Sequence, residues 1–303
     1  MEYEKYQEML ISRNPEEWAE LPGEINIALE KAVKRLGSLG TDDFVESRLA
    51  EPSTHLLRAS GKLLRPSLVF LGISYLGEDP KEFIDLGVAI ELLHVSSLIH
   101  DDFIDQDARR RGLEAVHLKY GNEAAVLAGD ALISKAIQMA CKFGVGAVDF
   151  VSKAAMEMCA GEILDFEYQR NGRSPDLKTY LNIAKLKCAS LTGASASIGA
   201  VSMGKKDFAG LYNFGSYLGM AFQIRDDVLE FASLNTEKRV DSNKLNANIV
   251  KGLLDHENLS KEEALDRAVH ENNKYIELSL DALENTGNAG ILEKYAEAVR
   301  LKF

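Results

Sequence analysis

LLHVSSLIHDDFIDQDARRRG, residues 92–112, is mostly apolar in its first half, then carries carboxylates, and ends in three arginines and a glycine. Apolar positions recur through residues 81–105 and only Gly87 interrupts them, which predicts one long helix. Residues four apart on a helix share a face, so Asp101 and Asp105 project together with Asp102 nearby. Unpaired carboxylates repel one another and desolvation raises their pKa values. Either cations bind at this helix end, or the cluster is an exposed, solvated face.

A second cluster favours the first of these two interpretations. Residues 219–231 read GMAFQIRDDVLEF, and Asp226, Asp227 and Glu230 repeat the spacing of the first cluster among apolar residues. A single cluster is best explained by a solvated face, whereas two matched clusters that each end an apolar helix predict a shared role. If the two helices face each other, five or six carboxylates line one cavity.

Hard divalent cations suit such a cavity. Magnesium is held by one or two carboxylates while waters and substrate phosphates complete its octahedron, so the clusters predict a phosphorylated ligand. Arg110 and Arg111 offer planar forks for bidentate contact with phosphate oxygens. An ordinary solvated basic patch remains the alternative interpretation of the three arginines.

Helical periodicity dominates the rest of the chain, which has only 6 prolines and 23 glycines. The one weakly alternating stretch is VGAVDFV at residues 145–151. We predict an all-α fold, with a single domain over residues 1–303. The other predicted helices cover residues 24–36, a segment that starts near Pro66, and 122–143, 147–169, 176–203, 206–233, 244–255, 260–284 and 290–301.

Composition narrows the class of protein further. The 303 residues include 46% hydrophobic ones, enough for a sizeable core, and carry a formal charge of −12, which makes nucleic acid a poor partner. The acidic balance also fits a protein that is merely kept soluble by its charge. The three cysteines are widely spaced, as in reduced cytosolic proteins. The N-terminus lacks a signal peptide pattern, and no apolar run reaches the roughly 18 residues of a membrane span, so we expect a cytoplasmic protein.

Several motifs, in order along the chain, together resemble the trans-isoprenyl diphosphate synthases. GKLLRP (61–66) resembles the family's GKxxRP, and HDDFIDQDARRRG resembles its first aspartate-rich motif with the following RRG. GDALIS (129–134) resembles GDxL. GEILD (161–165) resembles GQxxD with Glu162 in the glutamine position, and KCASL (187–191) resembles KTASL with Cys188 in place of threonine. GMAFQIRDD (219–227) resembles the start of FQxxDDxxD, whose last aspartate corresponds to Glu230.

The resemblance implies long helices around a deep cavity, a condensation of isopentenyl diphosphate with an allylic diphosphate, and a role for each motif residue. Asp101, Asp105 and Asp226 would bind magnesium, three ions by the family resemblance, supported by Asp102, Asp227 and Glu230. Asp165 would lie near the metal cluster, and Mn²⁺ is the expected substitute. Arg110, Lys187, Gln223 and, by position, Lys244 would hold the allylic diphosphate, and Phe222 would flank the reacting carbons. Lys62, Arg65, His94 and Arg111 would hold isopentenyl diphosphate.

The product length should depend on the helix face below Asp101. Short-chain members of the family tend to have an aromatic residue one turn earlier, where this chain has Ser96 and Ser97. These small side chains leave the path open and predict a product of geranylgeranyl length or longer, unless Ile90 or Met139 forms a deeper floor. A farnesyl synthase remains the short-chain alternative.

The chain departs from the family pattern after Glu230. The first expected Gly-Lys is absent, the loop is about five residues short by comparison with the family, and Lys244 is the candidate for the second lysine. This leaves a low-activity or regulatory relative as an alternative. A terpene cyclase is disfavoured, because GKLLRP and His94 provide a separate isopentenyl diphosphate site that a cyclase does not use. The resemblance also implies a homodimer. We expect no membrane span, but transient membrane contact for product release.

Overall fold

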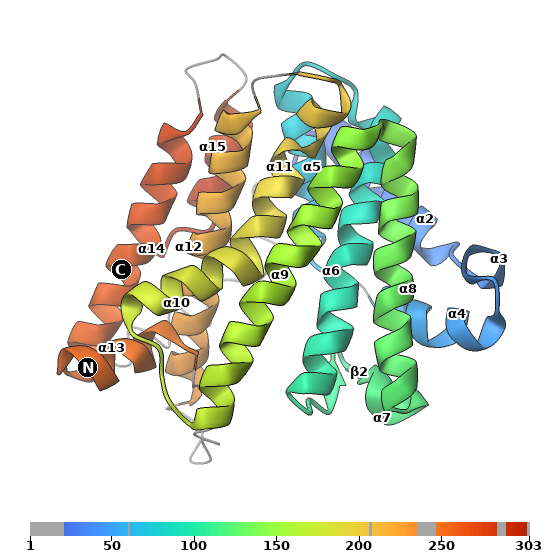
Figure 1. Cartoon of the computed structure of the whole chain (residues 1–303). Coiled ribbons are helices and arrows are strands. Elements are labelled where there is room, and N and C mark those ends of the chain that lie inside the picture. Colours follow the sequence, from blue (N-terminus) through green and yellow to red (C-terminus); the bar gives the residue numbers. More distant parts are fainter. Residues whose placement is uncertain (1–20, 60, 206–207, 235–246, 284–288, 302–303) are drawn as a thin grey trace. The chain divides into compact units, whose positions relative to one another are not determined.

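A computed structural model of the chain describes residues 21–59, 61–205, 208–234, 247–283 and 289–301. The fold is all-α, as predicted, and the strands within these described ranges form one short antiparallel hairpin (Figure 1). The helical elements are α2 (Gly23–Gly37), α3 (Thr41–Phe44), α4 (Ser47–Thr54), η2 (Leu56–Arg58), α5 (Leu64–Tyr75), η3 (Pro80–Phe83), α6 (Ile84–Ile104), α7 (Val116–Tyr120), α8 (Asn122–Ala140), η4 (Cys141–Phe143), α9 (Val145–Asn171), α10 (Leu177–Ala184), η5 (Lys185–Ala189), α11 (Ser190–Ser202), α12 (Ala209–Leu234), α13 (Ile249–Glu257), α14 (Lys261–Asp281) and α15 (Gly290–Glu297); the strands are β1 (Arg109–Arg110) and β2 (Leu113–Glu114).

The chain forms two compact units. The amino-terminal unit consists of Leu21–Met156 with Ala194–Tyr212, and the carboxy-terminal unit includes Glu157–Gly193 with Asn213–Phe303. Helices α9, α11 and α12 each contribute residues to both units. The first acidic cluster belongs to the amino-terminal unit and the second to the carboxy-terminal unit.

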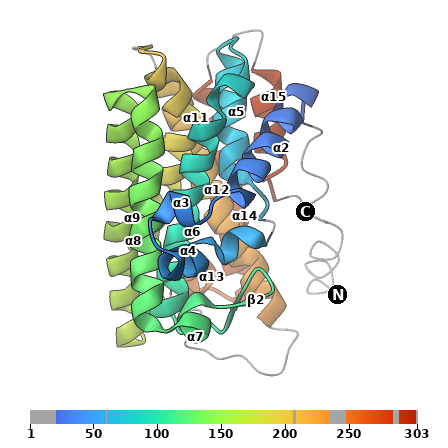
Figure 2. The same cartoon turned by 90° about the vertical axis from the view of Figure 1, so that its right-hand side faces the viewer.

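Helix α6 is the central element of the amino-terminal unit. Its side chains are apolar on nearly every face, and Leu86, Ile90 and Leu92 are fully buried. It packs along α8 and against α5 and α2 (Figures 1 and 2). Small residues on α8 allow the close approach: a Cβ on Gly129 would clash with the His100 ring of α6. A helix that is apolar all round is stable in water only when it is enclosed in this way.

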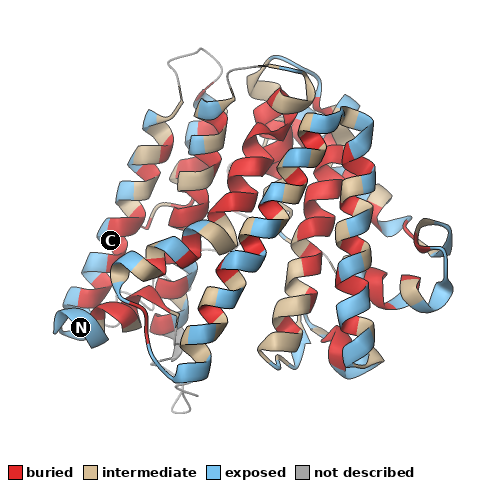
Figure 3. Ribbon diagram, in the orientation of Figure 1, coloured by how far each residue is buried: buried red, intermediate tan, exposed pale blue. Residues whose placement is uncertain are grey.

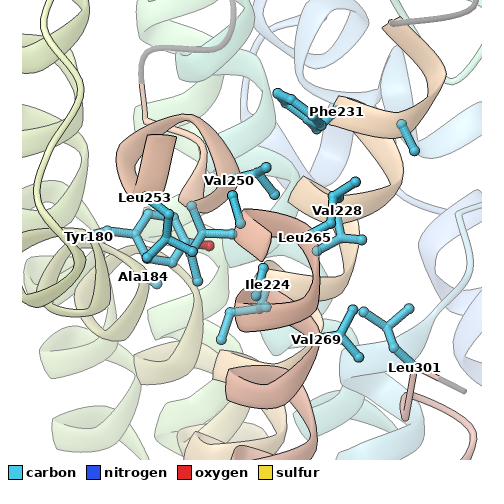
Figure 4. Close-up of a cluster of buried hydrophobic side chains, with 14 of the residues drawn as sticks. Tyr180, Ala184, Ile224, Val228, Phe231, Val250, Leu253, Leu265, Val269 and Leu301 are labelled. Carbon is cyan, nitrogen blue, oxygen red and sulfur yellow. The ribbon is translucent and has the colours of Figure 1, made fainter. Parts of the chain in front are cut away.

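The core of the carboxy-terminal unit gathers side chains from α10, α12, α13 and α14 (Figure 4). Ile224 and Val228 lie one turn apart on α12 and are fully buried. Leu253 comes from α13 and Leu265 from α14, and Tyr180 of α10 is 2% exposed. This cluster fixes the face that α12 buries, and therefore the direction in which its acidic residues project.

Burial follows one face of each outer helix (Figure 3). On α9, Ala154 and Met158 are buried, whereas Met156 and Ile163 are exposed. The alternation has the helical period, not the strand period, and α9 includes the weakly alternating stretch at 145–151.

Two predicted helices differ from the observed ones in their hydrogen bonding. The helix predicted over 176–203 is continuous from Leu177 to Ser202 but widens into a π-helical turn at η5. The helix predicted over 81–105 begins instead with the tighter turn η3, with Pro80 at its start and Asp79 capping it. Apolar periodicity locates a helix but does not distinguish these local pitches, because a single turn of different pitch barely changes the pattern.

Two segments, Pro80–Ile104 and Asn122–Phe143, are long and apolar enough to cross a membrane by length and composition. The sequence has no uninterrupted apolar run of that length, and these segments meet the test because it admits up to two Asp, Glu, Lys or Arg residues in the window. Core helices of soluble proteins meet the same test, and 61% of the first window is buried inside the protein.

We expect Asn272→Ala to lower the free energy of unfolding by about 2–3 kcal/mol, because its buried amide joins three elements. Asn272 Nδ2 donates to the Ala221 carbonyl over 2.7 Å, and its Oδ1 accepts from the Leu301 amide over 3.0 Å. Urea denaturation followed by circular dichroism measures the change. Asn273→Ala is the matched control, because the neighbouring Asn273 is half-buried and its Oδ1 has no hydrogen-bond partner among the described residues. Equal losses in both variants would contradict the assignment.

Candidate functional site

The first acidic cluster lies at the C-terminal end of α6. Asp101 and Asp105 are half-buried, one helical turn apart, whereas Asp102 is fully buried. Asp102 Oδ1 accepts a hydrogen bond from Arg110 Nε over 2.6 Å and lies 2.5 Å from Arg110 Nη2 in an ion pair. Arg110 Nη2 also lies 3.2 Å from Asp107 Oδ2. The hairpin β1–β2, which the sequence did not predict, holds Arg110 over the helix end.

The Asp102–Arg110 pair is buried on its carboxylate side. Burial raises the pKa of Asp102, although the hydrogen bonds and charge of Arg110 oppose the shift. The same contacts raise the pKa of Arg110 against the opposing effect of burial. Asp102 Oδ2 has no hydrogen-bond partner among the described residues, so the pair keeps an acceptor that a cation or donor can satisfy.

A second ion pair anchors Arg111. Its Nη2 lies 3.0 Å from Oε1 of Glu91, a carboxylate of α6 that is 2% exposed and whose pKa burial raises. The Arg111 guanidinium occupies the space beside Gly61: a Cβ at that glycine would lie 2.6 Å from Arg111 Cζ. Arg111 has φ +51°, in the left-handed region that side chains rarely adopt, and so does Leu63. The segments GKLLRP and RRG are thus brought together, as their predicted common role requires.

His94 and Arg65 form the third contact of the amino-terminal unit. Arg65 Nη1 lies 3.1 Å from His94 Nε2. Burial and then the charges of Arg65, Arg111 and Arg110 hold the pKa of His94 well below its ordinary value. His94 is therefore neutral and accepts from the guanidinium. Arg65 Nε is buried without a hydrogen-bond partner among the described residues, and Lys62 is exposed.

The second acidic cluster on α12 repeats the arrangement of the first. Asp227 is 5% exposed, whereas Asp226 and Glu230 are exposed, the Asp226 side chain by 62%. Successive helix positions differ by about 100°, so the outer two carboxylates of an i, i+1, i+4 set lie about 40° apart, whereas the middle one is turned about 100° from the first and about 60° from the last. In both clusters the middle carboxylate is the one that is buried.

Asp227 is held by donors from two elements. Gln223 Nε2 donates to its Oδ1 over 2.7 Å, and the Ile249 amide donates to its Oδ2 over 3.0 Å. Burial raises the pKa of Asp227 to about 7, although these donors and the neighbouring Tyr180 hydroxyl oppose the shift. Asn248, which caps the start of α13, also donates to the Asp227 carbonyl. Cys188 Sγ lies 2.8 Å from Gln223 Oε1, so both ends of this amide are engaged.

Lys187 lies in the π-helical turn η5 and faces the end of α9. Its ammonium is 2.6 Å from Glu162 Oε2 and 2.8 Å from Asp165 Oδ2. Glu162 Oε1 and Asp165 Oδ1 are buried and have no hydrogen-bond partner among the described residues. Sequence reasoning gave no role to Glu162 or Tyr180; the signal for Glu162 was its place in GEILD, where the family pattern has an uncharged residue.

Three other predicted site residues lie on α12 and α6. Phe222 is half-buried on α12 beside Gln223. On α6 the Ser96 hydroxyl is buried and donates to the Leu93 carbonyl, while Ser97 is half-buried and donates to the His94 carbonyl. Lys244 lies outside the described residues. The common cavity predicted for the two acidic clusters stays a prediction, since they belong to different units.

The donor chemistry of both clusters fits a hard cation. Among the residues that the structure describes, no group of three or more His, Cys, Asp or Glu side chains is arranged to hold a metal ion. Magnesium needs only one or two carboxylates when a phosphate completes its shell. The buried Asp102 Oδ2, which has no hydrogen-bond partner among the described residues, provides an oxygen of the required kind.

The chain matches the sequence model of a known protein family. The sequence model of the polyprenyl synthetase family matches residues 46–284 of the chain. A curated relative, the geranylgeranyl pyrophosphate synthase of Geoglobus acetivorans, is 36% identical over 192 residues, which cover 61% of this chain and 60% of the relative. Heptaprenyl diphosphate synthase component 2 of Geobacillus stearothermophilus is 35% identical over 206 residues, 66% of this chain and 64% of that protein. The chain spans 59–61% of the length of three such relatives.

Solved structures agree with this match over more of the chain. The heptaprenyl diphosphate synthase of Staphylococcus aureus superposes with a TM-score of 0.77 at 26% identity, covering 91% of this chain and 97% of the other. A geranylgeranyl pyrophosphate synthetase of Pyrococcus horikoshii gives a TM-score of 0.76 at 25% identity, covering 99% and 100%. The resemblance drawn from the motifs is confirmed.

The half-buried, neutral His94 predicts a specific loss of stability in acid. Its folded-state pKa is depressed, so the unfolded chain takes up a proton below about pH 6.5 that the folded protein does not. Stability is therefore lost as the pH falls from there, by at most about 1.4 kcal/mol per pH unit from this group. His94→Gln keeps an acceptor for Arg65 and should show a flatter profile between pH 7 and 5 in urea denaturation. Parallel profiles would contradict the prediction; His270→Gln, at an exposed histidine, is the control.

Proposed function

The chain belongs to the polyprenyl synthetase family, and from this premise we propose that it is a prenyltransferase that condenses isopentenyl diphosphate with an allylic diphosphate. The product we propose is a trans-polyprenyl diphosphate of geranylgeranyl length or longer. The observation that carries the proposal is the repeated arrangement of the two acidic clusters. In each, the middle carboxylate is buried and hydrogen-bonded, and the other two share a different face.

Members of this family depend on a metal ion. We propose magnesium, three ions when substrate is bound, with Mn²⁺ as a substitute. Asp101, Asp105 and Asp226 would hold it, supported by Asp227 and Glu230, and Asp102 would support Asp101 and Asp105 through its pair with Arg110. When bound, the metal supplies Lewis-acid stabilisation of the departing diphosphate.

The isopentenyl diphosphate would bind to the cationic groups of the amino-terminal unit. Arg65 and Arg111 lie around neutral His94, Lys62 is exposed nearby in sequence, and the Arg65 Nε donor is buried without a partner among the described residues. A buried guanidinium donor without an acceptor is costly, and a diphosphate oxygen would satisfy it. This supports the binding of an anion.

The allylic diphosphate would bind to Arg110, Lys187 and Gln223, with Lys244 as a further contact in the part of the chain that is not described. Gln223 is fixed at both ends of its amide by Cys188 and Asp227, so it presents one defined orientation. Phe222, the preceding residue, would flank the reacting carbons.

The reaction requires little acid–base machinery. The allylic C–O bond breaks and its electron pair leaves with the diphosphate. The double bond of isopentenyl diphosphate then attacks the allylic cation and forms the new C–C bond. The proton lost from the resulting cation passes to the departing diphosphate. The basic side chains stabilise the charge that develops on the leaving group, which is the main contribution expected of such a site.

We propose further that the protein works in the cytoplasm as a homodimer, with transient membrane contact when the lipid product leaves, and that it binds no nucleic acid. Its formal charge of −12 supports the last point. Because the protein is negatively charged, its anionic substrates must arrive together with cations or exchange with carboxylates of the protein.

Purified protein supplied with magnesium, isopentenyl diphosphate and each allylic starter in turn should form a longer prenyl diphosphate, measured by chromatography of the extracted lipid.

Asp101→Asn and Asp226→Asn should each lower kcat by about 100- to 1,000-fold, because each removes charge from the proposed metal ligands. Asp149→Asn, at an exposed position of α9, should leave the rate unchanged. Product formed without isopentenyl diphosphate would indicate a cyclase, and no product from any starter would indicate a regulatory relative.

The length of the product should respond to the face of α6 below Asp101. Ser97 lies one turn before Asp101 on the same face and is half-buried, while Ser96 is buried beside it. Ser97→Phe and Ser96→Phe should each shorten the main product by at least one isoprene unit, because a bulky ring blocks the growing chain. Ser97→Ala is the control. An unchanged product distribution in both phenylalanine variants would contradict this assignment of the path.

A further inference from the structure

The Lys187 ammonium is shared between two carboxylates of α9. Its Nζ lies 2.6 Å from Glu162 and 2.8 Å from Asp165, and both carboxylates are largely buried, with side chains 15% and 8% exposed. One positive charge faces two negative charges, so this group of three carries a net charge of −1. The inference that follows rests on the proposed function, because it concerns how the allylic diphosphate reaches Lys187.

The fold fixes this contact through the backbone. A Cβ on Gly161 would lie 2.5 Å from the Lys187 amide nitrogen, so only glycine allows α9 to approach η5 so closely. Glu162 is the next residue, and Asp165 lies one turn further on the same face of α9. The wider π-helical turn carries Lys187 toward them, and such turns often occur at functional sites.

A diphosphate and the Glu162 carboxylate bind Lys187 by the same chemistry. Both are anionic acceptors, so a phosphate oxygen that approaches the Lys187 ammonium competes with the ion pair between Lys187 and Glu162. The second oxygens, Glu162 Oε1 and Asp165 Oδ1, are buried and have no hydrogen-bond partner among the described residues. The group therefore has more acceptors than donors, and an incoming anion adds to that excess.

We propose that Glu162 competes with the allylic diphosphate for the Lys187 ammonium and thereby lowers the affinity of the enzyme for this substrate. Glu162 is then a positioning residue that acts through Lys187. A glutamine at position 162, as in the GQxxD pattern, would keep the shape of the side chain and one hydrogen-bond acceptor. Because glutamine is uncharged, separating it from the Lys187 ammonium would cost less free energy. Asp165 remains as a counter-ion in either case.

The first test is Glu162→Gln, with Glu167→Gln as the matched control, because Glu167 lies on the same helix, is exposed and undergoes the same change of charge. Glu162→Gln should lower the KM for the allylic diphosphate by about fivefold to tenfold, with kcat and the KM for isopentenyl diphosphate unchanged. Glu167→Gln should change neither constant. A KM for the allylic substrate that stays the same or rises in Glu162→Gln would overturn the proposal.

The second test does not depend on catalysis. Titration calorimetry with inorganic pyrophosphate, in the presence of a chelator of divalent ions, should show tighter binding to Glu162→Gln than to wild type or Glu167→Gln. The gain should disappear in the Lys187→Gln background, because the competition acts through that ammonium. A gain that persists without Lys187, or no gain at all, would overturn the proposal. If the wild-type protein formed no prenyl product, the proposed function would be refuted. The pyrophosphate titrations would still show whether Glu162 competes with a diphosphate for the Lys187 ammonium.

Discussion

A carboxylate that is buried loses its hydration, and a protein retains it only with a cation or several donors beside it. This constraint organises the described parts of the site. Asp102 is held by Arg110, Glu91 by Arg111, Asp165 by Lys187, and Asp227 by an amide side chain and a backbone N–H. Each of the three ion pairs joins a helix to a different segment of its unit. The acidic residues therefore set the local geometry before any ligand is considered.

Three of the proposed substrate-binding cations, Arg110, Arg111 and Lys187, thus already have a carboxylate partner. Binding of a diphosphate is an exchange of one anion for another, and its affinity is the difference between two strong interactions. A buried pair that loses one member leaves an uncompensated charge, which costs about 3–5 kcal/mol. Carboxylates displaced in this way would be stabilised by metal ions that arrive with the substrate, which reconciles an acidic protein with anionic ligands.

The all-α fold and the two acidic clusters were predictable from the sequence, because helical periodicity and the i, i+4 rule act locally. The burial of Asp102 and Asp227 follows from the same rule once the apolar face of each helix is known. The partner of Lys187 was not predictable, because it depends on a π-helical turn and on the contact at Gly161, which are tertiary features. The hairpin that holds Arg110 was missed for a similar reason: two-residue strands have no pattern to read.

Backbone strain near Gly61 indicates which interactions hold this segment in place. Leu63 and Arg111 both have left-handed dihedrals, each of which costs about 1–2 kcal/mol for a residue with a side chain. Their combined cost of about 2–4 kcal/mol is similar to the roughly 3–5 kcal/mol by which the protein would be destabilised if one partner of the buried Arg111–Glu91 pair were removed. The ion pair therefore helps to hold the strained loop, and Gly61 permits the contact by leaving room for the guanidinium. A segment held in this way presents Arg65 and Arg111 in a fixed arrangement, so an anion that binds there orders little of the chain and keeps more of its binding energy.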